Sequence, residues 1–225
     1  MSSLNDGPSS LGHVVLIDDD ASVRRSLATL LERSGYQVVL YASADAFLEN
    51  PVVPSPAVIV VDMRMPGTTG VALQAQLQTL AKHVPVVFVS GDSRPEEIIA
   101  AMKQGAMDFL LKPFTAQSML DAIARAMGLS EKAVMEAGKL EQVSDRLKRL
   151  TPRELEVCHW MVRGYSNQQI SNMDGAAPAT IKLHRARVMD KMAAATLPDL
   201  IDMLAGLLSA PRDPDSASPV DLGRA

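Results

Sequence analysis

The sequence of 225 residues contains a single cysteine, Cys158. One thiol cannot form an intrachain disulfide, and a chain without disulfides suits a reducing compartment. No apolar run approaches the roughly 18 residues that a membrane-spanning helix needs. The first ten residues, MSSLNDGPSS, lack the basic stretch and the apolar core of a secretory signal. These absences predict a cytoplasmic protein with no membrane partner.

The formal net charge of −4 argues, by itself, against binding to nucleic acid. The charge is unevenly distributed along the chain, however. Residues 1–128 carry nine basic and 13 acidic side chains, whereas residues 151–210 carry six of each. Four of the six cations in the second segment fall between Lys182 and Lys191. The overall balance therefore hides a local basic segment near the C-terminus.

Residues 13–128 alternate between short apolar runs and helical patterns. The apolar runs lie at Val14–Ile17, Gln37–Tyr41, Ala57–Val61, Pro85–Val89 and Phe109–Leu111. Near-continuous apolar strands that alternate with helices predict an α/β doubly wound domain, with a five-stranded parallel sheet covered on both faces. Ligands bind such sheets at the carboxyl ends of the strands. We therefore expect a functional site at that edge of this domain.

The second half of the chain is predicted to be helical. Residues 129–149 alternate apolar and charged side chains, which predicts a helical linker. Thr151, Pro152 and Glu154 form a capping box that begins a second domain, and residues 150–209 are typical of several short helices. Residues 210–225 are rich in Pro, Asp and Ser, which predicts a disordered tail.

Polar residues follow four of the five predicted strands. Asp18 and Asp19 follow the first strand, Asp62 the third, Ser90 the fourth and Lys112 the fifth. The carboxylates should converge at one edge of a parallel sheet, where they repel one another unless a cation joins them. An all-oxygen ligand set favours Mg²⁺. Each residue alone has an ordinary explanation, such as a helix N-cap for an aspartate, so the prediction depends on the joint pattern.

This pattern also suits phosphoryl chemistry. Asp62 is placed to act as a nucleophile that becomes an acyl phosphate. Lys112 can balance the charge of a phosphoryl group, and Ser90 can donate a hydrogen bond to one of its oxygens. Asp20, the remaining acidic residue of the first strand end, is expected to face solvent or to cap a helix.

Residues 13–127 resemble the receiver domain of response regulators through the motifs VVLIDDD, VIVVDMRMPGTTG, VVFVSG and DFLLKPF. The resemblance implies that Asp62 is the phosphoacceptor, and that Ser90 and Lys112 are the switch hydroxyl and the conserved lysine. It implies a Mg²⁺ site formed by Asp18, Asp19, Asp62 and the backbone carbonyl of Arg64. Phe109 occupies the place of the family's aromatic switch residue, and plain core packing explains it equally well.

The C-terminal domain has the pattern of a helix–turn–helix. Pro178 begins a helix that runs to Met192, with Ile181, Val188 and Met189 facing inward and the cations on other faces. A cationic second helix in such a motif enters the major groove of DNA, although charge alone also fits a solvated helix. Residues 150–208 resemble the LuxR-type output domain through LTPRELEV, GYSNQQI and TIKLHRARVMDKM.

The LuxR-type resemblance implies two sets of DNA contacts. The residues implied to face bases are Lys182, Leu183 and Ala186. The candidates for phosphate or sugar contacts are Asn167, Thr180, His184, Arg185 and Arg187. The chain departs from the family at Asp174, where a buried Leu is usual, and at Ala177, where a Ser N-cap is usual. Either Met173 shifts to fill the place of the Leu in a rebuilt turn, or the domain is marginally stable.

The whole chain resembles two-component response regulators of the FixJ/NarL type. That resemblance implies a transcriptional regulator, not an enzyme, with a sensor histidine kinase, promoter DNA and RNA polymerase as partners. Phosphorylation would create a homodimer through the receiver face near Ile99 and Lys103. Two alternatives remain open at this point: a phosphorelay or protein-interaction regulator whose C-terminal helices do not bind DNA, and a DNA binder independent of phosphorylation.

Overall fold

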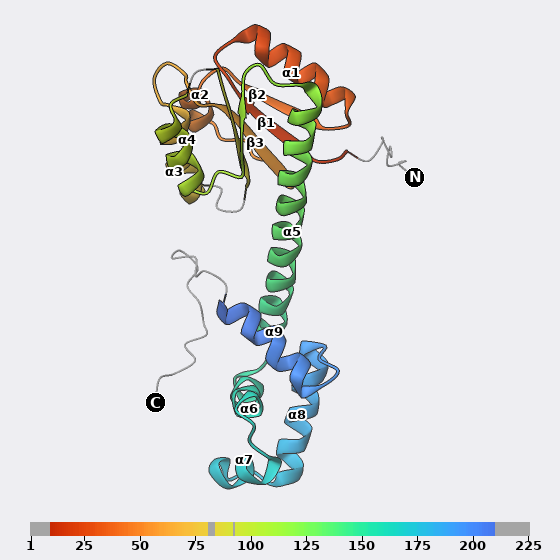
Figure 1. Ribbon diagram of the computed structural model, residues 1–225. Coiled ribbons are helices and arrows are strands. Elements are labelled where there is room, and N and C mark those ends of the chain that lie inside the picture. Colours follow the sequence, from red (N-terminus) through yellow and green to blue (C-terminus); the bar gives the residue numbers. More distant parts are fainter. Residues whose placement is uncertain (1–9, 81–83, 92, 210–225) are drawn as a thin grey trace, which may run out of the picture. The chain divides into compact units, whose positions relative to one another are not determined.

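The computed structural model describes residues 10–80, 84–91 and 93–209, which form two compact units (Figure 1). The division falls between Met135 and Glu136. The first unit is α/β and the second is built only of helices among its described residues, so the predicted fold class is confirmed. Among the described residues, no helix is both long enough and apolar enough to span a membrane.

The first unit is built on a five-stranded parallel sheet with the order β2-β1-β3-β4-β5. The strands are β1 (His13–Ile17), β2 (Gln37–Tyr41), β3 (Ala57–Asp62), β4 (Val86–Ser90) and β5 (Asp108–Leu111). Every residue of β3 and β4 is buried, as expected for interior strands that helices cover on both faces. Each strand lies within one residue of its position predicted from the sequence.

The register of the sheet determines which polar residues become neighbours. Ile17 of β1 pairs with Val61 of β3, so Asp18 and Asp62, the next residues along the two strands, lie at the same level of the sheet. Ser90, the last residue of β4, pairs with Leu111, the last residue of β5, so these two strands end at the same edge of the sheet. The polar residues that follow four of the strands are therefore gathered at one end of the sheet.

Helices cover both faces of the sheet (Figure 1). One face carries α1 (Ala21–Arg33) and the first part of α5 (Ala116–Lys148). The other face carries α2 (Ala44–Glu49), α3 (Gly70–Leu80) and α4 (Pro95–Lys103). Side chains alternate between the two cores: Val14 and Leu16 of β1 pack towards α1 and α5, whereas Val15 and Ile17 pack towards the other helices.

α5 is one continuous helix of 33 residues. Its first part packs on the sheet through Met119 and Ile123, and its last turns contribute Val143 and Leu147 to the core of the second unit. The domain end placed at residue 128 from the sequence therefore falls inside a helix. Residues 129–148 of the expected linker are helical.

The second unit contains α6 (Pro152–Val162), α7 (Asn167–Asp174), α8 (Pro178–Met192) and α9 (Leu197–Ser209). Thr151 and Glu154 form the predicted capping box of α6, and Gly175 ends α7 in a left-handed conformation with φ of 76°. Val157, Cys158 and other apolar residues of these helices form its core. The expected disordered tail, residues 210–225, lies outside the described residues.

Candidate functional site

An acidic pocket lies at the carboxyl edge of the sheet. Asp18 and Asp62 are buried, whereas Asp19 is exposed. One carboxylate oxygen from each of the three lies within 4.8 Å of the other two. The structure therefore brings together the three carboxylates expected from the sequence, and they offer only the hard oxygen donors that Mg²⁺ prefers.

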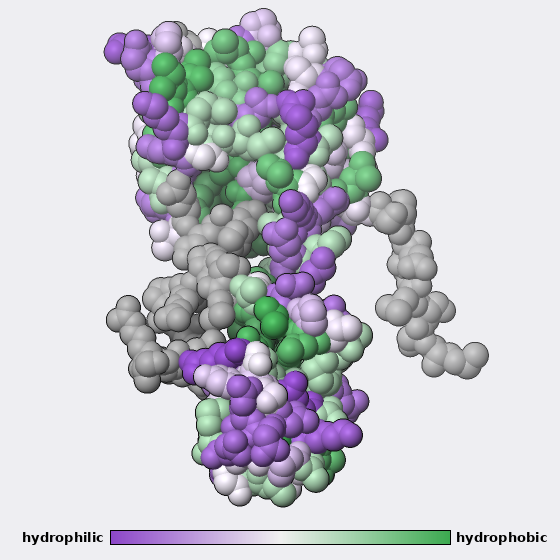
Figure 2. All heavy atoms as spheres, turned by 60° about the horizontal axis from the view of Figure 1, so that its bottom comes forward, coloured by the Kyte–Doolittle hydropathy of each residue, from purple (hydrophilic) through white to green (hydrophobic). Residues whose placement is uncertain are grey.

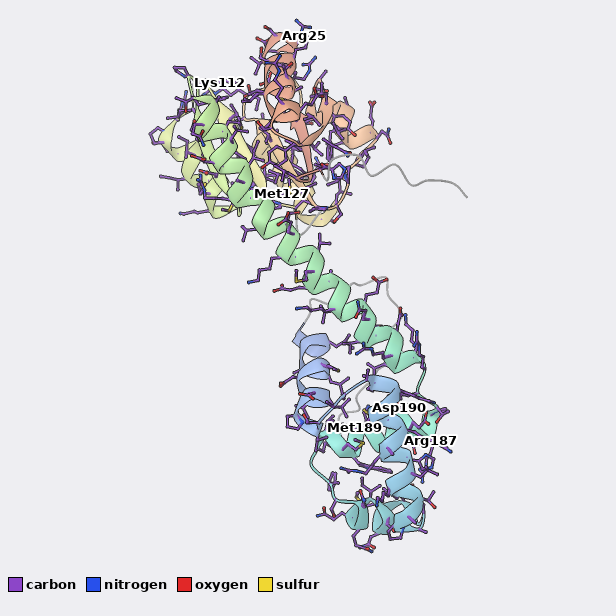
Figure 3. All side chains as sticks on the ribbon, turned by 90° about the vertical axis from the view of Figure 1, so that its right-hand side faces the viewer. Arg25, Lys112, Met127, Arg187, Met189 and Asp190 are labelled. Atoms are coloured by element: carbon purple, nitrogen blue, oxygen red, sulfur yellow. The ribbon has the colours of Figure 1, made fainter. Side chains whose placement is uncertain are left out.

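Lys112 bridges the two buried carboxylates. Its Nζ donates to Oδ2 of Asp62 at 2.7 Å and to Oδ2 of Asp18 at 3.1 Å. Burial alone would lower the pKa of Lys112, but the hydrogen bonds to Asp62 and Asp18 outweigh it, so the pKa is raised. Lys112 lies at the edge of the first unit, before α5 begins (Figure 3). Its ammonium group thus supplies positive charge inside the acidic pocket.

Backbone groups hold the carboxylates in place. The N–H of Arg64 donates to Oδ1 of Asp62 at 2.9 Å, and the N–H of Asp20 donates to Oδ1 of Asp18 at 2.8 Å. Burial raises the pKa of Asp18 despite the hydrogen bonds from Asp20 and Lys112. Arg24, which sequence reasoning did not single out, donates from its guanidinium to the backbone carbonyl of Asp18 at 2.5 Å.

Asp20 is the N-cap of α1, one of the two roles expected for it. Its side chain accepts hydrogen bonds from the N–H groups of Ser22 and Val23, and these bonds lower its pKa.

Ser90, at the end of β4, is fully buried, and its hydroxyl contacts that of Ser93. Phe109 packs partly against the core beneath α2, α3 and α4, and both interpretations given for it stand.

The second unit presents a helix–turn–helix formed by α7 and α8. Arg187 and Met189 project from opposite sides of α8 (Figure 3), and Met189 packs against the core. The face of this unit visible in Figure 2 has hydrophilic residues at its centre and apolar or neutral residues around them. The candidate DNA-contact residues that are exposed are Thr180, Lys182, Leu183, Ala186 and Arg187, and those that are half-buried are Asn167, His184 and Arg185.

Two of the cations of α8 bind groups inside the unit. Arg185 donates to the backbone carbonyl of Tyr165 at 2.9 Å. Lys191 donates to the carboxylate of Glu154 at 2.5 Å and to the backbone carbonyl of Arg149 at 3.1 Å. These two side chains therefore hold α8 against α6 and the segments flanking it. Lys182 and Arg187 are the exposed cations of this helix.

The two departures from the LuxR pattern have different structural outcomes. Ala177 has the extended backbone of an N-cap, yet no side-chain hydrogen bond caps α8. The expectation that Met173 fills the place of the usual Leu is wrong, because its side chain is 52% exposed. The carboxylate of Asp174 is buried instead and forms an ion pair with Arg153 of α6. This pair joins residues far apart in the sequence, so no local pattern could have indicated it.

Comparison with known proteins agrees with this two-part organisation. The family model of the response regulator receiver domain matches residues 14–124, and that of the bacterial regulatory proteins of the luxR family matches residues 148–204. The transcriptional regulatory protein FixJ of Azorhizobium caulinodans is 39% identical over 206 residues, which cover 92% of this chain and 97% of that protein.

Solved structures give the same result. The response regulator StyR matches with a TM-score of 0.77 and 35% identity, covering 86% of this chain and 98% of StyR. Full-length FixJ from B. japonicum matches with a TM-score of 0.54 and 33% identity, covering 90% of this chain and all of that one. Both similarities extend across the receiver-like and the helical unit.

Proposed function

Because this chain belongs to the response regulators that join a receiver domain to a LuxR-type DNA-binding domain, and is a phosphorylation-dependent transcriptional regulator, we propose that Asp62 is its phosphoacceptor. The contact of 2.7 Å between Lys112 and Asp62, within a cluster of carboxylates, is the observation that supports this assignment. The donor is a sensor histidine kinase.

The chemistry is a transfer of one phosphoryl group. A carboxylate oxygen of Asp62 attacks phosphorus, the bond from phosphorus to the donor's nitrogen breaks, and the leaving imidazole retains the electron pair. The product is an acyl phosphate on Asp62. Lys112 is already in contact with the attacking carboxylate, so its charge can stabilise the phosphoryl oxygens as the bond forms.

A divalent cation fits the acidic pocket. Asp18, Asp19, Asp62 and the backbone carbonyl of Arg64 would hold Mg²⁺, which supplies positive charge to neutralise the phosphoryl oxygens during transfer. The ammonium group of Lys112 already lies between two of these carboxylates. The chain's own contribution is to hold the carboxylates at the end of the sheet, where a donor can reach Asp62.

The output is binding to promoter DNA in the cytoplasm and action on RNA polymerase. α8 enters the major groove, with Lys182, Leu183 and Ala186 facing bases, while exposed cations such as Arg187 contact phosphates. The internal hydrogen bond of Arg185 favours a role in holding α8 in place over a direct phosphate contact. Phosphorylation brings two copies together through the receiver face that includes Ile99 and Lys103.

Intact mass spectrometry tests the phosphoacceptor. The parent protein, incubated with acetyl phosphate and Mg²⁺, should gain one phosphoryl mass, and Asp62→Asn should gain none, because an amide is a poor nucleophile. Asp121→Asn on the exposed side of α5 removes the same charge elsewhere and should be labelled like the parent. Equal labelling of Asp62→Asn and the parent would overturn the assignment.

Mobility-shift assays on promoter DNA test the output. Binding should tighten after treatment with acetyl phosphate in the parent and not in Asp62→Asn. Lys182→Ala should change which sequences are bound, and Arg187→Ala should weaken binding to all sequences and reduce the salt slope by about one. Lys148→Ala, an exposed cation paired with Asp145, serves as the control. If none of these changes alters DNA binding, the placement of α8 as the recognition helix is wrong, and the alternative in which the C-terminal helices bind a protein gains.

A further inference from the structure

The hydroxyl of Ser90 already has a partner in this structure. Its Oγ lies 2.6 Å from Oγ of Ser93, which stands in the loop between β4 and α4. Ser90 is fully buried, so water does not compete for its hydroxyl. Among the hydrogen bonds found for the described residues, the side chain of Ser90 is bound to Ser93 and the carboxylate of Asp62 to Arg64 and Lys112.

The surroundings of Ser93 determine how the two hydroxyl protons can be shared. Oγ of Ser93 lies 3.1 Å from the thioether sulfur of Met63, a buried residue that directly follows Asp62. A hydroxyl carries one proton, and a thioether sulfur can only accept. Ser93 can therefore donate its proton either to Ser90 or to Met63, but not to both. When it donates to Met63, Ser90 donates to Ser93, and both protons are then used. A phosphoryl oxygen on Asp62 would need that same proton of Ser90.

The backbone of Ser90 is fixed, so only its side chain can change partners. Ser90 pairs with Leu111 in the sheet, and its carbonyl accepts a hydrogen bond from the N–H of Lys112 at 2.7 Å. A change of partner from Ser93 to a phosphoryl oxygen is therefore a rotation of the side chain. The old hydrogen bond must break before the new one forms.

We propose that Ser93 is a positioning residue that competes with the phosphoryl group for the hydroxyl of Ser90. The proposal rests on the role proposed above for Asp62 and Ser90. In the unphosphorylated protein, Ser93 holds the hydroxyl away from the phosphoacceptor, which favours the resting state. Phosphorylation of Asp62 draws the hydroxyl of Ser90 to the new group and releases Ser93. Ser93 stands two residues before Pro95, where α4 begins.

Binding of beryllofluoride, a stable mimic of a phosphoryl group, tests the competition in the full-length protein with Mg²⁺. Fluorine NMR follows the bound ion directly. Ser93→Ala removes the competing partner and leaves the hydroxyl of Ser90 unsatisfied in the resting state. It should therefore bind beryllofluoride about two- to tenfold more tightly than the parent, the range for one hydrogen bond. Ser93→Thr retains a hydroxyl and should bind like the parent.

A double-mutant cycle shows whether the effect acts through Ser90. In the Ser90→Ala background no hydroxyl is left to compete for, so adding Ser93→Ala should change the affinity no further. An unchanged or weaker affinity of the Ser93→Ala single variant, or the same gain in the Ser90→Ala background, would overturn the proposal. Failure of the parent itself to bind beryllofluoride would reject the phosphoacceptor site, and with it this inference.

Discussion

The carboxylates of Asp18, Asp19 and Asp62 differ in what surrounds each of them. Asp18 and Asp62 are buried and share the ammonium group of Lys112, which offsets part of their mutual repulsion. Asp19 is exposed and follows Asp18 directly in the chain. The repulsion that the sequence suggests among three bare carboxylates is therefore small at Asp19. Its side chain can be changed without leaving a buried charge unpaired.

Asp19→Asn should consequently separate metal binding from folding. Without Mg²⁺, the free energy of unfolding should stay within about 0.5 kcal/mol of the parent, as for most surface substitutions. The stabilisation that Mg²⁺ gives the parent should be largely lost, because one ligand is gone. Thermal unfolding with and without Mg²⁺ measures both effects. Glu32→Gln, which removes an exposed charge from α1, should retain the full response to Mg²⁺. A parent-like response of Asp19→Asn would contradict a ligand role.

Glu154 is a buried carboxylate outside the acidic pocket, and it serves the fold of the DNA-binding domain. The hydrogen bond from Lys191, together with that from the N–H of Thr151, lowers its pKa from the ordinary 4.5 to about 2. The folded state therefore favours the charged form. The resulting stabilisation is fully present above the unfolded-state pKa of 4.5 and is lost as the pH falls towards 2.

Glu154→Gln should remove that acid dependence. The difference in the free energy of unfolding between parent and variant should be largest at neutral pH and should shrink as the pH falls from about 5 to about 3. Denaturant titrations across this range measure it. Glu156→Gln, two residues away, exposed and paired with Arg153, should show a much smaller difference at every pH. A pH-independent difference for Glu154→Gln would show that the contact with Lys191 does not depend on the charge of Glu154.

At the scale of elements, the positions of the strands could be predicted from the sequence, because buried parallel strands are continuous apolar runs. It did not reveal α2, since Ala44–Glu49 spans six residues, too few for a clear helical period. The contacts of Ser93 with Ser90 and of Arg153 with Asp174 were also missed. Such contacts depend on how loops and helices pack, which local patterns do not record.

α5 contains two glycines at positions where no neighbouring atom would exclude a larger side chain. Gly128 and Gly138 lie inside the helix, and a Cβ added to either would meet no atom within 4 Å. The segment between them is mostly exposed, including the apolar side chains of Leu129, Val134 and Met135. Glycine costs a helix about 1 kcal/mol relative to alanine. This segment of α5 is therefore weaker than its helical pattern alone suggests.

Gly128→Ala and Gly138→Ala should each stabilise this segment by about 0.5–1 kcal/mol. Hydrogen exchange of the amides between the two positions should slow by roughly two- to fivefold per substitution. Gly105→Ala is the matched control, because its Cβ also meets no atom within 4 Å, yet its φ is +86°. That substitution should destabilise the protein instead. Unchanged exchange in both α5 variants would show that the glycines do not limit the helix.

At the scale of the whole molecule, phosphorylation of one domain has to alter DNA binding by another. A second copy of the chain provides a route, since two DNA-binding domains on one site bind more tightly than one. The receiver offers a suitable face: Ile99 and Met102, three residues apart on α4, and Leu111 at the end of edge strand β5 are all exposed. Large exposed apolar side chains of this kind mark interaction surfaces when they lie close together.

Ile99→Glu should therefore uncouple phosphorylation from dimerisation. The variant should still gain one phosphoryl mass on Asp62, because Ile99 lies outside the acidic pocket. Sedimentation velocity should show that the phosphorylated parent sediments as a dimer and that the phosphorylated variant does not, since a buried, unpaired carboxylate costs several kcal/mol. Leu40→Glu makes the same change at an exposed leucine of β2, the opposite edge strand, and should dimerise like the parent. DNA affinity should follow dimerisation across the three proteins. If Ile99→Glu dimerises normally, or Leu40→Glu fails to, the interface lies elsewhere on the receiver.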